Sequence, residues 1–527
     1  MTTFDDILEE TGKFGRCQKR IFALLCMVSM PWAGIYVGIV FQGYTPDHWC
    51  RQPAVQEHRE TCGWTLRDGV KRTVPLVNVS GELQPSSCLQ YDMDWNSTAL
   101  SCDLSQELEL SESPRSSCKH GWEYDYEGRQ SFVTEFDLVC SDGWLVDMFQ
   151  ATLNVGFLIG SIAIGYLADR FGRKLSFLMS NLLNGIAGIL VAVAPNYVSL
   201  LVFRTLYGFG VKGGWVAGYV LITEIVGVEF RRTVGVVYQM FFSVGILILP
   251  LLAYYITDWR WLQVVITVPY ILFLSYYWFI PESPRWLLSQ NKKDKAIEIT
   301  EAMAKENGMT LSKQIETLTD DNANTTVSFM DLIRTPKMRK HTFILSYNWF
   351  TSAVVYQGLI MRLGILGGNV YIDFLISGLV EFPAAFLILF TIERIGRRLP
   401  FAVANFVAGA SCFITACIPD SKSWTQSVAC IGRLCITMTF EMVVFVNTEL
   451  YPTFVSCPSS FLVRSLAILA GGLVLLLPET RGVPLPDTID DIEFPERHVY
   501  LWKDQNGQLF NLLPTNDVTS NKDTAVV

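Results

Sequence analysis

The chain has 527 residues, of which 50% are hydrophobic and 17% are charged, whereas an ordinary globular domain has about 25% charged residues. This composition excludes a soluble multidomain protein. The apolar residues gather into uncharged blocks of about 20 residues, each long enough to cross the hydrocarbon of a bilayer. We therefore predict an all-α polytopic membrane protein.

The net charge of −9 is unevenly distributed. From Gln42 to Gly143 the chain has 17 Asp and Glu against 8 Lys and Arg, so this segment carries the whole excess. This charge balance gives no indication of a basic surface that would bind nucleic acid. Lys19 and Arg20 come directly before the first apolar block, which predicts that the amino terminus is cytoplasmic.

The acidic segment also holds an even number of cysteines and two glycosylation sequons, at Asn78 and Asn96. These features predict an oxidised, glycosylated extracellular domain. Its cysteines are Cys50, Cys62, Cys88, Cys102, Cys118 and Cys140. Six cysteines allow 15 pairings, which the sequence leaves open, and a zinc site is disfavoured because CxxC spacing is absent. The other cysteines lie in or beside apolar blocks and are expected to be reduced.

Eleven apolar runs are predicted to cross the membrane. In chain order they are 21–41, 144–168, 175–194, 198–225, 233–256, 261–280, 342–363, 369–391, 400–418, 424–447 and 461–477. The inner tails and loops before the eleventh run hold 22 Lys and Arg and the short outer loops hold three, as the positive-inside rule requires.

These runs divide the chain into seven parts. They are a cytoplasmic tail, a first helix, the extracellular domain, the rest of the first helical repeat, a cytoplasmic linker, an incomplete second repeat and a carboxy-terminal tail. Their ranges are 1–20, 21–41, 42–143, 144–280, 281–341, 342–477 and 478–527.

An internal repeat indicates two halves of six helices each. The block Asp169–Lys174 recurs as Glu393–Arg398 after an offset of 224 residues. The interval 228–280 in the first half holds two apolar runs, whereas the matching interval 453–477 in the second half has 25 residues and holds one. We therefore predict that the second repeat is one helix short.

The repeat and the motif Gly165–Lys174 resemble the major facilitator superfamily. Pro281–Trp286 resembles the branch of sugar porters and organic ion transporters. A cysteine-bearing segment between helices one and two is similar to the organic cation, anion and zwitterion family. Four further stretches resemble its polyspecific organic cation transporters: Tyr44–Cys50, Val133–Cys140, Tyr356–Gly358 and Leu379–Pro383. The missing segment matches the family's helix eleven, which carries an ionisable residue facing the pocket.

This resemblance implies electrogenic facilitated diffusion of organic cations by alternating access, across the plasma membrane. The substrates it implies are quaternary ammonium compounds, monoamines and cationic drugs, and homo-oligomerisation through the extracellular domain is a further expectation. A gating or structural role is implied for Gly165, Asp169, Arg170, Gly172, Arg173, Glu393, Arg394, Gly396, Arg397 and Arg433. Gly165 is expected to let helices approach, Asp169 to accept charge-assisted hydrogen bonds, and Arg173 and Lys174 to anchor the loop at the inner surface.

An ionisable group within the hydrocarbon region is costly and is a functional candidate by default. Eight such residues are predicted: Asp147, Arg204, Lys212, Glu224, Glu381, Arg433, Glu441 and Arg464. Glu381 and Glu441 are in the middle of the eighth and tenth runs and match pocket positions of the family. Attraction of a cation and an ion pair with Arg433 stay open as interpretations. In the family's pattern Lys212 and Arg433 neighbour the missing helix-eleven aspartate, so both are expected to lack that partner.

Aromatic side chains supply the second part of a cation site, because a ring face attracts an ammonium group. Any single membrane aromatic can instead be a packing residue or part of an interfacial belt. The aromatic candidates, with their polar partners, are Trp32, Tyr36, Trp215, Gln239, Phe242, Trp349, Tyr356, Gln357 and Phe440.

No enzyme signal competes with transport. The five histidines form no pair at ligand spacing, and the chain has neither a P-loop nor a nucleophile motif, so no catalytic residue, cofactor or metal is expected. Two alternatives stay open: an organic anion or zwitterion carrier, and a shortened non-transporting isoform or mis-joined gene model. Loss of helix eleven predicts that the 527-residue form is retained in the cell and carries little current.

Overall fold

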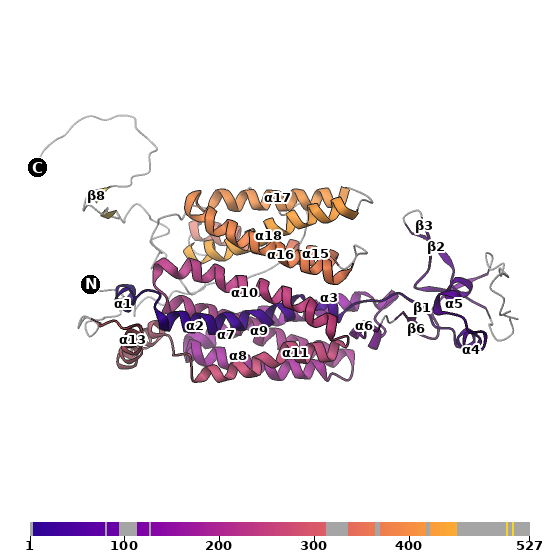
Figure 1. Cartoon of the computed structure of the whole chain (residues 1–527), viewed down its shortest axis with the longest axis horizontal. Helices are drawn as coiled ribbons and strands as arrows, with labels where there is room; N and C mark the ends of the chain where they lie inside the picture. The colour runs from indigo at the N-terminus through magenta and orange to yellow at the C-terminus, as the bar shows by residue number, and fades with distance from the viewer. Residues whose placement is uncertain are drawn as a thin grey trace, which may run out of the picture.

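The protein consists mainly of long helices that run side by side, with a small mixed domain at one end (Figure 1). The small helices α1 (Phe4–Glu10) and α13 (Lys293–Asn307) lie at the opposite end of the molecule. The structure is a computed structural model, and it describes residues 4–79, 82–93, 113–125, 128–311, 336–363, 369–417, 422–450, 502–503 and 509–510.

The amino-terminal half contains six of the predicted spans. Its elements are α2 (Arg16–Val37), α3 (Ile39–Gln42), α7 (Trp144–Phe171), α8 (Arg173–Ala192), α9 (Tyr197–Ile225), α10 (Val228–Tyr255), α11 (Trp259–Leu272) and the 3-10 helix η2 (Phe273–Tyr277). Their ends follow local chemistry. Asn196 caps α9 through a bond from the Ser199 backbone N–H, and Gly172 separates α7 from α8 with a φ of +108°.

The carboxy-terminal half contains the next four predicted spans. They are α15 (Pro336–Leu363), α16 (Val370–Arg394), α17 (Arg398–Cys417) and α18 (Lys422–Leu450). The eleventh predicted run, 461–477, lies outside the described residues. By length and composition alone, five described helices could cross a membrane: Arg16–Val37, Cys140–Phe171, Arg173–Ala192, Glu229–Tyr255 and Val370–Thr391. Between the halves, α12 (Pro284–Ser289) precedes α13 in the segment predicted as a linker.

The small domain is built from short helices and strand pairs held by disulfides. Three antiparallel pairs are β1 (His48–Cys50) with β6 (Trp122–Tyr124), β2 (Leu76–Val79) with β3 (Glu82–Pro85), and β4 (Leu89–Tyr91) with β5 (Arg115–Ser117). The remaining short elements are α4 (Pro53–Cys62), α5 (Leu66–Thr73), α6 (Phe132–Glu135) and η1 (Cys140–Asp142), and a separate pair joins β7 (Trp502–Lys503) to β8 (Leu509–Phe510).

The cysteines follow the predicted division. Disulfides join Cys50 to Cys118 and Cys88 to Cys140, and Cys62 is also disulfide-bonded, whereas Cys102 lies outside the described residues. Among the cysteines of the helical halves, the free ones that the structure describes are Cys17, Cys26, Cys412, Cys430 and Cys435. Asn78 lies in β2, and Asn96 is outside the described part, so glycosylation at both stays a prediction.

Helix α8 shows the burial pattern of a protein that faces lipid. Its polar residues point inward: the Asn181 and Asn184 side chains are fully buried. Large apolar residues such as Met179 and Ile186 are 55% and 51% exposed. A soluble protein would show the opposite arrangement, because soluble proteins rarely expose a broad apolar surface to water.

Helices α7 and α9 approach closely through glycines other than the predicted one. A Cβ added to Gly156 or Gly160 would lie 2.2 Å from a backbone oxygen of α9, so only glycine permits the contact. A Cβ added to Gly165 would meet nothing within 4 Å. The prediction that Gly165 allows helix approach is therefore wrong, because the helices touch one to two turns earlier.

Candidate functional site

Aromatic rings from α2, α9 and α10 form a cluster in the amino-terminal half. The ring centroid of Trp32 lies 4.6 Å from that of Phe242 and 5.3 Å from that of Trp215. Tyr36, one helical turn beyond Trp32, stacks on Tyr356 of α15 at 6.3 Å. This last contact joins the two halves, so the predicted aromatic residues come together across the boundary between them.

The carboxy-terminal half contributes the remaining predicted rings. Phe440 of α18 lies 6.0 Å from Tyr356 in a stacked arrangement and 5.2 Å from Trp349 in an edge arrangement. Phe157 of α7 and Tyr219 of α9 extend the cluster by stacking on Tyr36 and on Trp215. Sequence reasoning missed Phe157 and Tyr219, because an aromatic in an apolar run carries no signal of its neighbours.

The rings of Trp32 and Trp215 border a small cavity. Its other lining residues are Val28, Asn181, Val211 and Tyr270, and its volume of about 10 Å³ has room for about one water molecule. The amide of Asn181 has no hydrogen-bond partner among the described residues and would be satisfied by such a water. An organic cation would need these rings to move apart.

Glu381 lies in a buried ion pair. Its side chain is 2% exposed, and its Oε1 lies 2.8 Å from NH2 of Arg433. The same oxygen accepts a hydrogen bond from the Tyr356 hydroxyl at 3.0 Å, and Oε2 accepts one from Ser243 of α10 at 2.7 Å. Of the two interpretations of Glu381, the geometry matches the ion pair. The expectation that Arg433 lacks a partner is wrong, because α16 supplies the carboxylate.

Glu441 has a different environment. It is 6% exposed on α18, and no hydrogen bond or ion pair joins its carboxylate to another described residue. Its electrostatic neighbours are the like-charged Glu381 and the phenol of Tyr219. A buried carboxylate without a cationic partner is costly unless water or a ligand cation compensates it. Among the described residues, Glu441 is thus a buried acidic group without a cationic partner.

Polar groups around the rings differ in how far they are satisfied. The ammonium of Lys212 lies 4.3 Å from the ring centroid of Trp215 and 5.4 Å from that of Trp32. Both amide atoms of Gln357 are buried without a hydrogen-bond partner among the described residues. Gln239 is half-buried on α10, and no ring or hydrogen-bond contact joins it to the cluster within the described chain. Gln357 therefore has unused hydrogen-bonding capacity, whereas Gln239 has no defined role.

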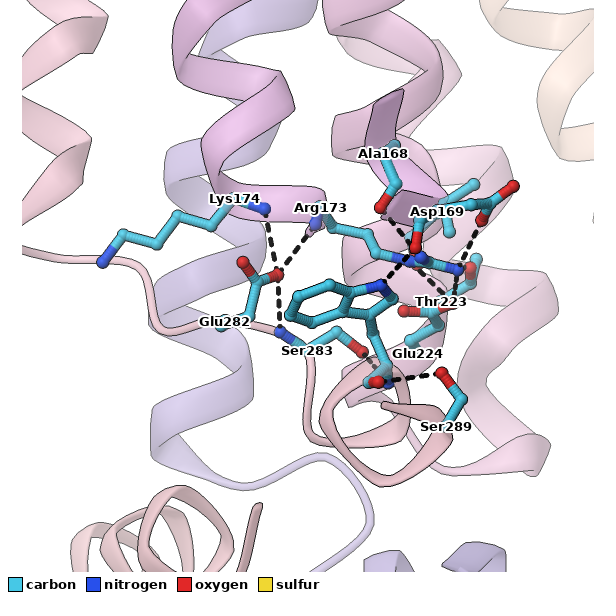
Figure 2. A network of polar contacts seen from close by, with 11 residues as sticks. Ala168, Asp169, Arg173, Lys174, Thr223, Glu224, Glu282, Ser283 and Ser289 are labelled. Carbon is cyan, nitrogen blue, oxygen red and sulfur yellow. Dashed lines mark hydrogen bonds and ion pairs between the residues drawn. The ribbon is translucent and has the colours of Figure 1, made fainter. Parts of the chain in front are cut away.

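The first repeated motif forms a polar joint at the end of the bundle away from the small domain (Figure 2). Arg173 is 9% exposed and donates to Glu224 of α9 through NH2 at 3.2 Å and to the Ala168 carbonyl at 3.0 Å. Its NH2 also lies 3.1 Å from a carboxylate oxygen of Asp169, so the predicted acceptor role of Asp169 is observed. Arg170 points elsewhere and contacts Tyr166.

Glu282 ties this joint to the segment that follows the sixth span. Its Oε1 accepts backbone N–H bonds from Arg173, Lys174 and Ser283 at 2.9, 3.0 and 3.0 Å (Figure 2). A Cβ added to Gly172 would lie 2.4 Å from Glu282 Oε2. Glu224 and Asp169 hold the Arg173 side chain inside the protein, and anchoring of the loop at the inner membrane surface stays a prediction.

The second copy of the motif has the same backbone shape. Gly396 has a φ of +99°, close to the +108° of Gly172. Arg397 is buried at 2% exposure, and its counterpart Arg173 is also buried. Arg394 lies 4.3 Å from the ring centroid of Phe390. The side chain of Glu393 is outside the described part. The repeat found in the sequence is thus a repeat of local structure.

Known proteins resemble this chain over most of its length. The family model "Sugar (and other) transporter" matches residues 114–470. Solute carrier family 22 member 2 of Mus musculus is 50% identical over 535 residues, which cover 94% of this chain and 97% of the relative. Member 2 of Homo sapiens is 48% identical and member 3 of Mus musculus is 46% identical, each covering 94% of this chain and 96% of the relative.

Solved structures agree on the fold. The xylose transporter XylE from E. coli in a partially occluded inward open conformation gives a TM-score of 0.51 at 16% identity, covering 87% of this chain and 88% of that one. XylE bound to 6-bromo-6-deoxy-D-glucose gives 0.53 at 17% identity, covering 87% and 86%. The protein is thus a multi-pass membrane transporter with the major facilitator fold, and not an enzyme. The resemblance seen in its motifs is confirmed, and the chain belongs to solute carrier family 22.

Proposed function

We propose that the protein carries organic cations, among them quaternary ammonium compounds, monoamines and cationic drugs, across the plasma membrane. The observation that carries this proposal is Glu441, a buried carboxylate with no cationic partner among the described residues. Glu441 on α18 directly follows Phe440, whose ring stacks on Tyr356 at 6.0 Å, and its electrostatic neighbour Tyr219 stacks on Trp215 at 5.6 Å. A carboxylate beside ring faces is the chemistry that recognises an organic cation.

The same geometry supports broad specificity. The face of an aromatic ring attracts a cation without fixing hydrogen-bond directions, so cations of different shape can be accommodated. An organic anion would need uncompensated positive charge, and Arg433, one of the cations of this region, is already neutralised by Glu381 at 2.8 Å. The similarity to transporters over 94% of the chain gives no support to a non-transporting form.

Alternating access and electrogenic uptake follow as parts of the proposal. The cluster contains rings from both halves, and Tyr36 of one half stacks on Tyr356 of the other. A relative motion of the halves would therefore open the cluster to one side of the membrane at a time. For a monovalent cation, a potential of 100 mV supplies about 2.3 kcal/mol, or roughly 50-fold accumulation. No additional energy source is needed.

Uptake of radiolabelled tetraethylammonium by expressing cells tests the proposal. Glu441→Gln is expected to lower kcat/KM about tenfold, and Trp215→Ala to raise KM, while surface abundance is unchanged. Glu229→Gln is the matched control, because this carboxylate is 60% exposed and pairs with Lys13 at 2.9 Å. Kinetics of both variants equal to the control, or uptake independent of the membrane potential, would contradict the proposal.

A further inference from the structure

An arginine from the edge of the small domain is surrounded by aromatic rings. Arg129 lies on the segment before α6, and its guanidinium carbon is 4.5 Å from the ring centroid of Tyr371. It is 5.6 Å from the centroid of Tyr44 and 6.0 Å from that of Phe41. Its NH2 donates a hydrogen bond to the carbonyl of Ala253 at 3.0 Å. We call Phe41, Tyr44 and Tyr371 the outer aromatic cage.

This arginine is held by rings and a carbonyl, not by an acid. No ion pair joins Arg129 to a carboxylate among the described residues, whereas nearby Arg260 forms one with Glu135. A guanidinium with three rings within 6.0 Å experiences the attraction that an organic ammonium ion would experience in the same place. The outer aromatic cage is therefore a cation-binding site whose occupant in this structure belongs to the chain.

The cage lies across the junction of the two halves, at their small-domain end (Figure 1). Phe41 belongs to α3 of the amino-terminal half, and Tyr371 is in the first turn of α16. Gln130, next to Arg129, is fixed to the amino-terminal half because its N–H donates to the Thr257 carbonyl at 3.1 Å. The Arg129 side chain thus reaches from one half to a ring of the other.

We propose that the outer aromatic cage is a second binding site for small organic cations, which enter from the small-domain side and displace the guanidinium of Arg129. The proposal rests on the proposed function for the nature of the ligand. While Arg129 occupies the cage it bridges Ala253 and Tyr371, and an entering cation exchanges one ring-bound charge for another. No covalent bond forms or breaks in this exchange, the hydrogen bond to Ala253 is given up, and the charge within the cage is conserved.

Equilibrium binding of radiolabelled tetramethylammonium to the purified full chain in lipid nanodiscs tests this site. A tethered group competes at an effective concentration of about millimolar, so Arg129 weakens the binding of tetramethylammonium to the cage in the wild type. At tetramethylammonium concentrations well below that value, Arg129→Ala is expected to raise the amount bound about twofold, because the cage becomes available beside the central site. Arg129→Lys retains the tethered charge and is expected to bind as the wild type does.

Two further variants control for charge and location. Arg115→Ala removes an exposed positive charge of the same domain, from β5, and is expected to leave binding unchanged. Tyr371→Ala combined with Arg129→Ala is expected to abolish the gain. If Arg129→Ala does not yield a monodisperse protein, Arg129→Gln carries the same expectation, because its amide can still donate to Ala253.

The outcomes separate this site from the proposed function. Unchanged binding in both folded Arg129→Ala and Arg129→Gln, or a gain that survives Tyr371→Ala, would overturn the outer site. If the wild type binds no cation but Arg129→Ala does, the outer site stands and the central cation site fails. If wild-type uptake is normal and the variants gain nothing, the proposed function stands and the outer site fails.

Discussion

Replacing Arg433 with Met is expected to destabilise the carboxy-terminal half. Arg433 and Glu381 are each 2% exposed and join α18 to α16 through a contact of 2.8 Å. Methionine keeps an unbranched side chain, but among the described residues it leaves the Glu381 carboxylate with only the hydroxyl donors of Ser243 and Tyr356. The variant thus buries a negative charge without its counter-ion.

The size of this effect follows from burial and from the remaining hydrogen bonds. Removing one partner of a buried ion pair costs about 3–5 kcal/mol. Both hydroxyls still donate to the carboxylate, so the expected loss is at the lower end, about 3 kcal/mol, out of a total stability of about 5–15 kcal/mol. Replacing Glu381 with Gln as well removes both charges and is expected to recover at least half of the loss.

An exposed ion pair provides the matched control. Arg20 lies 2.9 Å from Glu306, and their side chains are 45% and 38% exposed. Arg20→Met is expected to cost at most about 1 kcal/mol, because water screens the pair. The assay is unfolding by sodium dodecyl sulfate in mixed micelles, followed by the fluorescence of the 14 tryptophans. A loss for Arg433→Met no larger than for Arg20→Met, or no recovery in the double variant, would refute the reasoning.

Three more outcomes are expected. Gly172→Ala should lower the free energy of unfolding by about 2 kcal/mol, because the positive φ of this residue is favourable only for glycine. Gly165→Ala should be neutral or slightly stabilising, because its Cβ would meet no atom within 4 Å. Equal losses in both variants would contradict the different roles given to the two glycines. Asn78→Gln should increase gel mobility and remove one glycosidase-sensitive shift. Asn324, followed by Thr325 and Thr326, is a sequon in the predicted cytoplasmic linker, so Asn324→Gln should change nothing, and a shift from Asn324 alone would contradict the predicted topology. Among molecules that surface biotinylation finds at the plasma membrane, an epitope at Val527 should be accessible on intact cells if eleven segments cross; labelling of those molecules only after permeabilisation would contradict that count.

The helices of the bundle could be predicted from the sequence, because hydrocarbon thickness alone requires long uncharged runs. Their ends were less accurate. The seventh span was placed at 342–363, but α15 begins at Pro336, since polar residues can continue a helix beyond the hydrocarbon. The sixth was predicted at 261–280, but α11 ends at Leu272 and continues as a 3-10 helix to Tyr277. Apolar composition does not distinguish these two helix types.

The composition of the site could be predicted, but its pairings could not. Motif and hydropathy identified Glu381, Glu441 and Arg433 as intramembrane charges. Which carboxylate meets the guanidinium depends on the rotation of α16 against α18, and no local pattern specifies it. Ser243 and Arg129 carried no signal for a related reason, since their roles depend on contacts made between the halves. Whether helix eleven is absent stays a prediction, because residues 451–500 lie outside the described part of the chain.

The strengths of these contacts suit a transporter whose halves move as units. Glu381 holds Arg433 within the carboxy-terminal half, and separating that pair would cost about 3–5 kcal/mol. Across the halves, the hydrogen bond from Ser243 to Glu381 is worth about 1.5–3 kcal/mol, and the stacked pair of Tyr36 and Tyr356 about 0.5–1.5 kcal/mol. The free energies of these bridging contacts are comparable to the ~2.3 kcal/mol that a potential of 100 mV supplies to one charge. In the proposed cycle, a bound cation would compensate for losing them, and we expect the buried ion pair to remain intact.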